Sequence, residues 1–279
     1  MMKINIGIPK ALKLFGGFVR YYDTTEDLSK LAALVSSGDH QNILACCGGG
    51  DQALTMLGAS PRQGSLWAVD INPAQLFVLA AKASYLKKND LMPSFEQLQK
   101  LHPGRVGAVK KNVRRLQEMY FYHTATGKKI APPAAMAEKY KLITSNEMFV
   151  ARRSMLFWKE DPLFIARVRA RLGNLHFSQM DIFDTPEHFK QGSLDLIYLS
   201  DIFWPEALPY YQAKLTLMAG LLRPGGIIIS CLDQGDDFMG RGVSPGLMLA
   251  GQAGRSALKI DKDHTDGGYL VLERVRRGR

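Results

Sequence analysis

A glycine cluster between two short apolar runs is the sequence feature that most constrains this fold. The first run leads into Cys46-Cys47-Gly48-Gly49-Gly50, and the second, Leu66-Trp67-Ala68-Val69, is followed directly by Asp70. The last glycine and Asp70 lie about 20 residues apart, the interval between the glycine turn and the ribose-binding acid of a βαβ nucleotide-binding unit. Because parallel strands end at one edge of a sheet, the turn and the acid are expected to face one ligand.

Short apolar runs alternate with helical patterns along most of the chain, which predicts an α/β sheet that is parallel except at one edge. Expected strands cover residues 42–46, 66–70, 175–180, 194–199, 227–232, 257–261 and 269–275. Expected helices cover residues 24–36, a segment after the glycines, 73–88, 162–172 and 206–222. The last two strands are joined across Asp266-Gly267-Gly268, which is typical of a hairpin turn.

Residues 89–159 interrupt this alternation with a basic and aromatic stretch of helical character. We expect this stretch to form a helical insertion that covers the ligand edge. A chain of 279 residues, 46% of them hydrophobic, is large enough to bury a substantial core. The whole chain, residues 1–279, is therefore expected to form a single domain with this insertion.

The composition excludes several classes of protein. The sequence contains no run of 18 or more apolar residues, so it predicts no transmembrane helix. The first nine residues do not resemble a secretory signal. Three cysteines give neither a disulfide framework nor a zinc-ligand spacing, so no metal is expected. The expected location is cytoplasmic, with peripheral membrane contact as an open alternative.

The formal net charge of +10 leaves three interpretations open. The basic residues could form solvated helix faces, attract an anionic membrane or lipid, or bind nucleic acid through the same long-range field. They cluster at residues 110–115, 152–153, 167–171 and 274–279. Nothing in the sequence indicates an oligomeric state.

Several of these motifs together resemble a class I S-adenosylmethionine-dependent transferase. They are the glycine turn, Asp70, Asp181 after the third strand, Asp195-Leu196-Ile197, Leu221-Leu222-Arg223-Pro224-Gly225-Gly226 and the terminal hairpin. The resemblance implies a Rossmann-like methyltransferase fold, with a mostly parallel seven-stranded sheet and a C-terminal antiparallel hairpin. It also implies S-adenosylmethionine as the cofactor.

Three other segments resemble a narrower family, the aminocarboxypropyl transferases that begin betaine-lipid synthesis. They are residues 49–54 (Gly-Gly-Asp-Gln-Ala-Leu), residues 69–75 (Val-Asp-Ile-Asn-Pro-Ala-Gln) and the aromatic-plus-acid segment 21–27. In that family the 3-amino-3-carboxypropyl group of the donor passes to diacylglycerol. The turn departs from the usual methyltransferase pattern, because Ala45 stands where an acid is usual and Cys47 and Asp51 stand where glycines are usual.

The resemblance implies a set of donor-binding residues, each with a structural alternative. Asp70 would bind the ribose, Asp181 the adenine amino group with Ile182 or Phe183 against the ring, and Asp51 and Gln52 the amino or carboxylate group. Asp181 and Asp51 could instead cap helices. The complete set is Tyr22 as a lid, Cys47, Gly48, Gly49, Gly50, Asp51, Gln52, Asp70, Ile71, Asn72, Gln75, Asp181, Ile182 and Ser200.

Asp201 is the candidate catalytic residue, because it follows the fourth strand and could orient an acceptor hydroxyl or act as general base. His123 is a weaker candidate base in the insertion. The expected activity is transfer of the aminocarboxypropyl group to a lipid-like hydroxyl, and the alternative is a methyltransferase acting on a small molecule. An RNA methyltransferase is disfavoured, since no Asn/Asp-Pro-Pro-Tyr-like motif is present. A donor-binding regulatory protein without turnover is the non-enzymatic alternative.

Overall fold

The structure, a computed structural model, describes residues 24, 26, 28–62, 64–70, 73–101, 122–123, 128–129, 157–200, 208–231, 258–260 and 269–275. The chain divides into two compact units. Unit 1 contains Met1–Leu28, Cys47–Leu54 and Asp70–Leu172, and unit 2 contains Ser29–Cys46, Thr55–Val69 and Gly173–Arg279. Each unit is assembled from separate segments of chain, so no single cut in the sequence divides them. A single domain over residues 1–279 stays a prediction.

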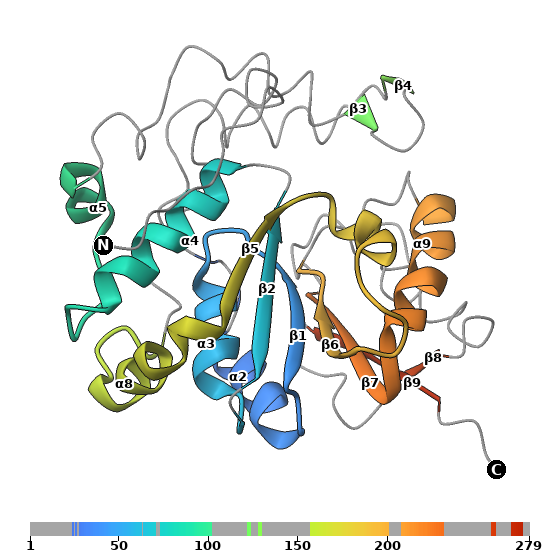
Figure 1. Ribbon diagram of the computed structural model, residues 1–279, viewed down its shortest axis with the longest axis horizontal. Helices are drawn as coiled ribbons and strands as arrows, with labels where there is room; N and C mark the ends of the chain where they lie inside the picture. Colours follow the sequence, from blue (N-terminus) through green and yellow to red (C-terminus); the bar gives the residue numbers. More distant parts are fainter. Residues whose placement is uncertain are drawn as a thin grey trace, which may run out of the picture. The chain divides into compact units, whose positions relative to one another are not determined.

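A seven-stranded sheet forms the centre of unit 2, with only the last residue of one strand in unit 1 (Figure 1). Its strand order is β5-β2-β1-β6-β7-β9-β8. The strands are β1 (Asn42–Cys46), β2 (Ser65–Asp70), β5 (Leu175–Gln179), β6 (Leu194–Tyr198), β7 (Leu222–Cys231), β8 (Leu258–Ile260) and β9 (Tyr269–Arg274). Counted along the chain, this is the order 3-2-1-4-5-7-6.

The pairing directions confirm the predicted fold class. Strand β1 runs parallel to both β2 and β6, and β6 runs parallel to β7. Strand β9 pairs antiparallel with β7 and with β8, which is the predicted C-terminal hairpin. Strand β1 has β2 on one side and β6 on the other, so the strand order reverses at β1. In α/β sheets, ligands bind at such a topological switch point. The chain therefore has an α/β fold whose sheet is mostly parallel and ends in a C-terminal antiparallel pair, as the resemblance to class I transferases implies.

Apolar side chains of the central strands form the core of unit 2. All five residues of β6 are buried, as expected for a strand that is covered on both faces. They pack with residues of η3 (Ile182–Glu187) and α9 (Leu208–Leu221). Burial of each large apolar side chain contributes about 1.5–3 kcal/mol, so this cluster is a main source of stability for the unit.

Two of the family-like motifs meet in unit 2, where they join strand ends. The Asp195 carboxylate accepts the backbone N–H groups of Gln41 and Asn42, both at 2.7 Å, and pairs with Arg223 Nε at 2.5 Å. Arg223 Nη2 also donates to the carbonyl of Asp39 at 2.6 Å. These two motifs therefore stabilise the start of β1 and β6, and they do so at the end of the strands that lies opposite the predicted ligand edge.

The predicted Leu-Arg-Pro-Gly-Gly turn lies inside β7 rather than before it. Register advances from Leu194↔Leu222 to Leu196↔Ile227, so β6 moves on by two residues while β7 moves on by five. The extra residues form an irregularity in which Gly225 adopts φ +82°. The predicted strand, residues 227–232, begins five residues later than β7, because Arg223-Pro224-Gly225-Gly226 interrupt the apolar run although pairing with β6 already starts at Leu222.

The helices lie close to their predicted positions. They are α2 (Leu28–Ser37), α3 (Asp51–Ala59), α4 (Pro73–Leu86), α8 (Pro162–Arg171) and α9. The side chain of Asp161 caps α8 by accepting the N–H groups of Leu163 and Phe164. Within the described part of the chain, no helix is both long and apolar enough to cross a membrane.

The expected insertion at 89–159 is described only in part. It contains α5 (Phe95–Leu101) and an antiparallel pair of two-residue strands, β3 (Tyr122–His123) and β4 (Lys128–Lys129). The strand pair was not predicted, because a pair this short has no periodicity to detect. A mostly helical cover stays a prediction.

Candidate functional site

The glycine turn connects β1 to α3 in unit 1. It closes with a hydrogen bond from Gly50 N–H to the carbonyl of Cys47 at 2.8 Å. Gly48 and Gly50 have φ values of +50° and +88°, which favour glycine. A Cβ on Gly50 would lie 2.8 Å from Leu79 Cβ, whereas a Cβ on Gly48 would make, among the described residues, an ordinary van der Waals contact with the Gln52 amide at 3.7 Å. Gly50 thus allows α4 to pack closely against the turn.

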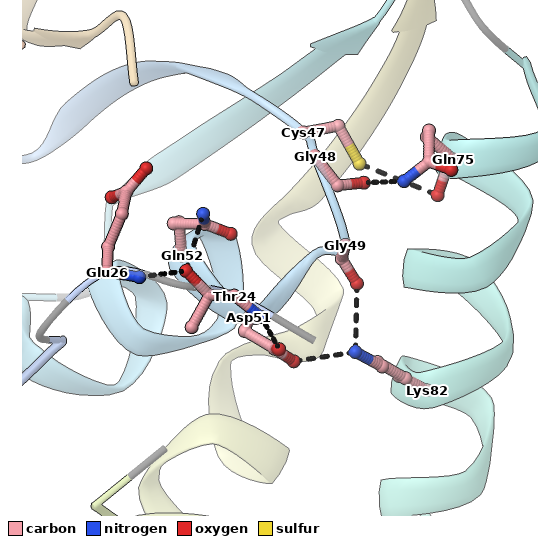
Figure 2. Close-up of polar contacts among 9 residues, drawn as sticks. All are labelled: Thr24, Glu26, Cys47, Gly48, Gly49, Asp51, Gln52, Gln75 and Lys82. Atoms are coloured by element: carbon pink, nitrogen blue, oxygen red, sulfur yellow. Dashed lines mark hydrogen bonds and ion pairs between the residues drawn. The ribbon is translucent and has the colours of Figure 1, made fainter. Parts of the chain in front are cut away.

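A buried ion pair fixes this turn to α4 (Figure 2). Lys82 Nζ lies 2.7 Å from Asp51 Oδ1 and 3.0 Å from the carbonyl oxygen of Gly49. Both charged side chains are 1% exposed. The sequence analysis did not identify Lys82. Two features of the sequence could have indicated the pair: Lys82 is the one charged residue in the apolar segment 73–86, and an acid, Asp51, stands directly after the glycines.

The upstream segment reaches the same turn through Thr24. Its backbone N–H donates to Asp51 Oδ2 at 3.0 Å, and its hydroxyl oxygen accepts Gln52 Nε2 at 2.9 Å. The same oxygen accepts the N–H of Glu26 at 3.1 Å. Asp51 is therefore bonded through both of its oxygens, to Lys82 and to Thr24. These contacts give Asp51 a structural role, and its proposed contact with a ligand stays a prediction.

The side-chain amide of Gln52 is hydrogen-bonded through Nε2 but not, among the described residues, through Oε1. Its side chain is buried, and Oε1 has no hydrogen-bond partner within the described part of the chain. Buried polar atoms are normally bonded, so an acceptor left alone needs an explanation.

Gln75, in the first turns of α4, holds the other side of the turn. The side-chain Nε2 of Gln75 donates to the backbone carbonyl of Gly48 at 2.6 Å, and the backbone carbonyl of Gln75 accepts a hydrogen bond from the thiol of Cys47 at 3.6 Å (Figure 2). Both side chains are buried. The structure therefore brings Gln75 to the glycine turn, where it bonds to the backbone of the turn, and its contact with a donor stays a prediction.

Asp70 lies beside the turn on the neighbouring strand. The β1–β2 register pairs Cys46 with Val69, so Asp70 comes level with Cys47. Burial raises the pKa of the Cys47 thiol, and the Asp70 carboxylate raises it further. The partly buried Asp70 carboxylate therefore lies within electrostatic reach of the turn. The predicted pairing of glycines with a strand-end acid is present in the structure.

In unit 2, two further predicted residues follow strand ends. Asp181 caps η3 by accepting the N–H of Phe183 at 2.9 Å, which is the structural alternative given for this acid. Ile182 and Phe183 are buried in the core cluster. Ser200 follows β6 with φ +55°, an uncommon value for a residue other than glycine. Its carbonyl is held by Ser230 Oγ and by Cys231 N–H, each at 2.9 Å.

Four further predicted residues, Tyr22, Ile71, Asn72 and Asp201, lie outside the described residues, as does the side chain of His123. Among the described residues, no group of three His, Cys, Asp or Glu side chains is arranged to hold a metal ion.

Comparisons with known proteins give similarity in structure alone. A scan against models of protein families finds no match, and a search of curated proteins finds none either. An O-methyltransferase family protein from Burkholderia thailandensis is similar with 14% sequence identity and a TM-score of 0.42, over 90% of this chain and 57% of that one. A SAM-dependent O-methyltransferase from Thermotoga maritima has 10% identity and a TM-score of 0.43, over 98% and 74% of the two chains.

A cofactor-bound protein from MTB has 11% identity and a TM-score of 0.45, over 99% of this chain and 94% of that one. At these TM-scores the likeness carries no argument about activity.

Proposed function

We propose that this chain is an S-adenosylmethionine-dependent transferase. The observation that carries the proposal is the position of Asp70, level with Cys47 and beside the glycine turn, at the carboxyl ends of neighbouring parallel strands. In α/β sheets this edge binds nucleotides, with an acid at the end of the second strand accepting the ribose hydroxyls. The sequence motifs that resemble class I transferases favour S-adenosylmethionine over a dinucleotide.

The residues at the turn fit such a donor. Gly48 carries no side chain at the turn, and the buried Gln52 Oε1 has no hydrogen-bond donor among the described residues. Asp70 would hold the ribose, and the turn would hold the amino-acid end. When bound, S-adenosylmethionine supplies a carbon made electrophilic by its sulfonium sulfur. The protein's contribution would be alignment of acceptor and donor, which can contribute about 7–11 kcal/mol.

Calorimetric titration of S-adenosylmethionine into the Asp70→Ala variant tests the proposal. Loss of a charge-assisted hydrogen bond should weaken binding by about 1.5–3 kcal/mol, roughly 10- to 150-fold. Glu96→Gln, which removes an exposed acid from α5, is the matched control and should bind like the wild type. Unchanged affinity in a folded Asp70→Ala variant would rule out the assignment.

Methyl transfer is the simplest chemistry for this fold, and a small molecule is the simplest acceptor. Aminocarboxypropyl transfer to a lipid-like hydroxyl is the second candidate. It is favoured by residues 49–54 and 69–75 and by the upstream segment, whose Thr24 contacts Asp51 and Gln52. Asp201 would serve as base or orienting group in either case.

The nucleoside product distinguishes the two chemistries. Methyl transfer leaves S-adenosylhomocysteine, whereas aminocarboxypropyl transfer leaves methylthioadenosine. Mass spectrometry after incubation of the protein with S-adenosylmethionine and a lipid extract would identify the product. Methylthioadenosine formed only in the presence of lipid would establish the second candidate, and S-adenosylhomocysteine would establish the first.

A further inference from the structure

We propose that the outer face of α8 is a docking surface for an anionic lipid bilayer. This surface, the α8 face, consists of Leu163 and Arg167 on the helix and of Phe157 just before it. Leu163 and Phe157 would enter the boundary between headgroups and acyl chains, and Arg167 would pair with lipid phosphates. The inference is independent of the proposed function, because the α8 face contains none of the predicted donor-binding residues.

The two sides of α8 differ in a way that defines this face (Figure 1). The buried side chains are Phe164, Ile165 and Val168. The exposed positions are Pro162, Leu163, Ala166, Arg167 and Ala170. A solvated helix face normally carries polar residues and charges of both signs, whereas α8 contains no acid and exposes apolar and basic side chains together.

Two large apolar side chains are exposed at the start of the helix. Leu163 is 74% exposed, the highest value among the exposed large apolar side chains of the described residues. Phe157 is 48% exposed and packs edge to face on the Phe164 ring at 5.4 Å. The same ring stacks on the buried Trp158 at 5.1 Å, so packed aromatic side chains support this part of the surface. Neighbouring exposed apolar side chains are typical of a surface that binds a partner.

The basic part of the α8 face begins one turn further along the helix. The guanidinium of Arg167 lies 4.9 Å from the centre of the Phe164 ring. Burial lowers the pKa of Arg171, another turn on, and the charge of Arg167 lowers it further. Like charges four residues apart on a helix destabilise one another, so an anion bound beside these two arginines would be stabilised.

The acids around α8 do not cancel this charge. Asp90 already pairs with Arg169 at 2.6 Å, and Asp161 accepts N–H groups of the helix as its N-cap. Residues 157–172 contain two acids, Glu160 and Asp161, against one lysine and three arginines. The surface is therefore positive overall and complementary to an anionic partner.

The combination of side chains favours a bilayer over nucleic acid. An arginine pairs well with the phosphates of either partner. A polynucleotide, however, would leave the side chain of Leu163 largely in water. At a bilayer surface, leucine and phenylalanine enter the interface while adjacent basic residues contact the headgroups, which is the pattern of interfacial helices.

Sedimentation of the full chain with phosphatidylcholine vesicles, with and without phosphatidylglycerol, tests the inference. The wild type should prefer the vesicles that contain phosphatidylglycerol, and salt should release it. Arg167→Gln should weaken this binding about fivefold by removing a contact with the headgroups. Leu163→Gln should weaken it about tenfold by removing an inserted apolar side chain. Lys190→Gln and Leu217→Gln change exposed side chains outside α8, and these matched controls should bind like the wild type.

A polarity-sensitive dye attached at Leu163→Cys distinguishes insertion from attraction by charge. Its emission should shift to the blue on the anionic vesicles, whereas the same dye at Leu217→Cys should show no shift. The inference is overturned if either Leu163→Gln or Arg167→Gln binds vesicles like the wild type, or if the dye at position 163 does not shift. A wild-type chain that binds polyuridylate RNA but not vesicles would also overturn it, since the α8 face would then serve nucleic acid. Calorimetry with S-adenosylmethionine tests the proposed function separately, and Arg167→Gln and Leu163→Gln should leave that affinity unchanged.

Discussion

At the scale of single residues, the Lys82–Asp51 pair is the strongest constraint on the glycine turn. Two charges that are both 1% exposed are costly to bury, and they remain stable because each has further hydrogen bonds, to Gly49 and to Thr24. The pair also joins three segments that are distant in sequence. Its position explains why an acid follows the glycines in this chain.

Lys82→Met should lower the free energy of unfolding by about 3–5 kcal/mol, because Asp51 would be left as an unpaired buried charge. Urea unfolding followed by circular dichroism measures this change. Adding Asp51→Asn removes the unpaired charge while keeping an oxygen for Thr24 N–H. The double variant should therefore be more stable than Lys82→Met alone. A double variant that loses the sum of the two single effects would show that the pair contributes nothing beyond its separate parts.

At the scale of elements, the packing of α4 against the turn depends on one glycine. Gly50→Ala should destabilise unit 1 by about 2–4 kcal/mol, because φ +88° is strained for alanine and its Cβ would lie 2.8 Å from Leu79 Cβ. Gly48→Ala has the strain without the clash and should cost about 1–2 kcal/mol. Thermal unfolding of both variants measures the difference, with Gly173→Ala as the control because its Cβ would meet no described residue within 4 Å. Equal losses at positions 48 and 50 would contradict the packing role.

A buried histidine links the start of β1 to pH. Burial lowers the pKa of His40; the carboxylates of Asp195 and Asp39 act in the opposite direction, and the charge of Arg223 lowers the pKa further. Nδ1 of His40 has no hydrogen-bond partner in the described part of the chain. The folded state therefore binds this proton less readily than the unfolded state, whose histidine titrates near pH 6.5. The contribution to stability is complete above about pH 6.5 and declines as pH falls toward the lowered pKa, by up to about 1.4 kcal/mol per pH unit.

Urea midpoints at pH 7.5 and pH 5.5 check this expectation. The wild type should lose more stability between the two values than His40→Gln, which has no proton to bind at that position. All other titratable residues are the same in both proteins, so the difference between them reports on the presence of His40. A variant with the same pH dependence as the wild type would exclude the histidine as its source.

The sequence predicted elements better than contacts. Strand and helix positions follow from apolar periodicity, and Asp70 was found because its distance from the glycines is fixed by one βαβ unit. Lys82, by contrast, is a single charge in an apolar helix, and its partner is decided by how α4 packs. The lack of a hydrogen-bond partner for Gln52 Oε1 among the described residues is likewise a property of packing, because no sequence pattern indicates which polar atoms remain unbonded. The position of Ser200 directly after a predicted strand is visible in the sequence, whereas its positive φ is a property of the folded backbone.

At the scale of the whole molecule, the net charge of +10 is the property that remains to be explained. Part of it has a structural use. Arg169 donates to the carbonyls of Leu86 and Asn89 and pairs with Asp90, so it fastens α8 to the end of α4. Arg167, by contrast, is exposed and lies over the ring of Phe164. The cluster 167–171 is therefore divided between internal contacts and surface charge.

If the surface charge serves contact with an anionic membrane, the chain should sediment with anionic vesicles more than with neutral ones. Binding should fall as salt rises, because exposed charges are screened over about 8–10 Å at physiological ionic strength. Each well-placed Lys or Arg contributes about 1 kcal/mol near such a surface. Replacing Arg114, Arg115, Arg152 and Arg153 together by Gln should weaken vesicle binding and leave donor affinity unchanged. Replacing Arg169 is unsuitable as a test, because its loss would also disturb α8. Equal binding to neutral and anionic vesicles would show that the charge is solvated surface and would favour a small-molecule acceptor.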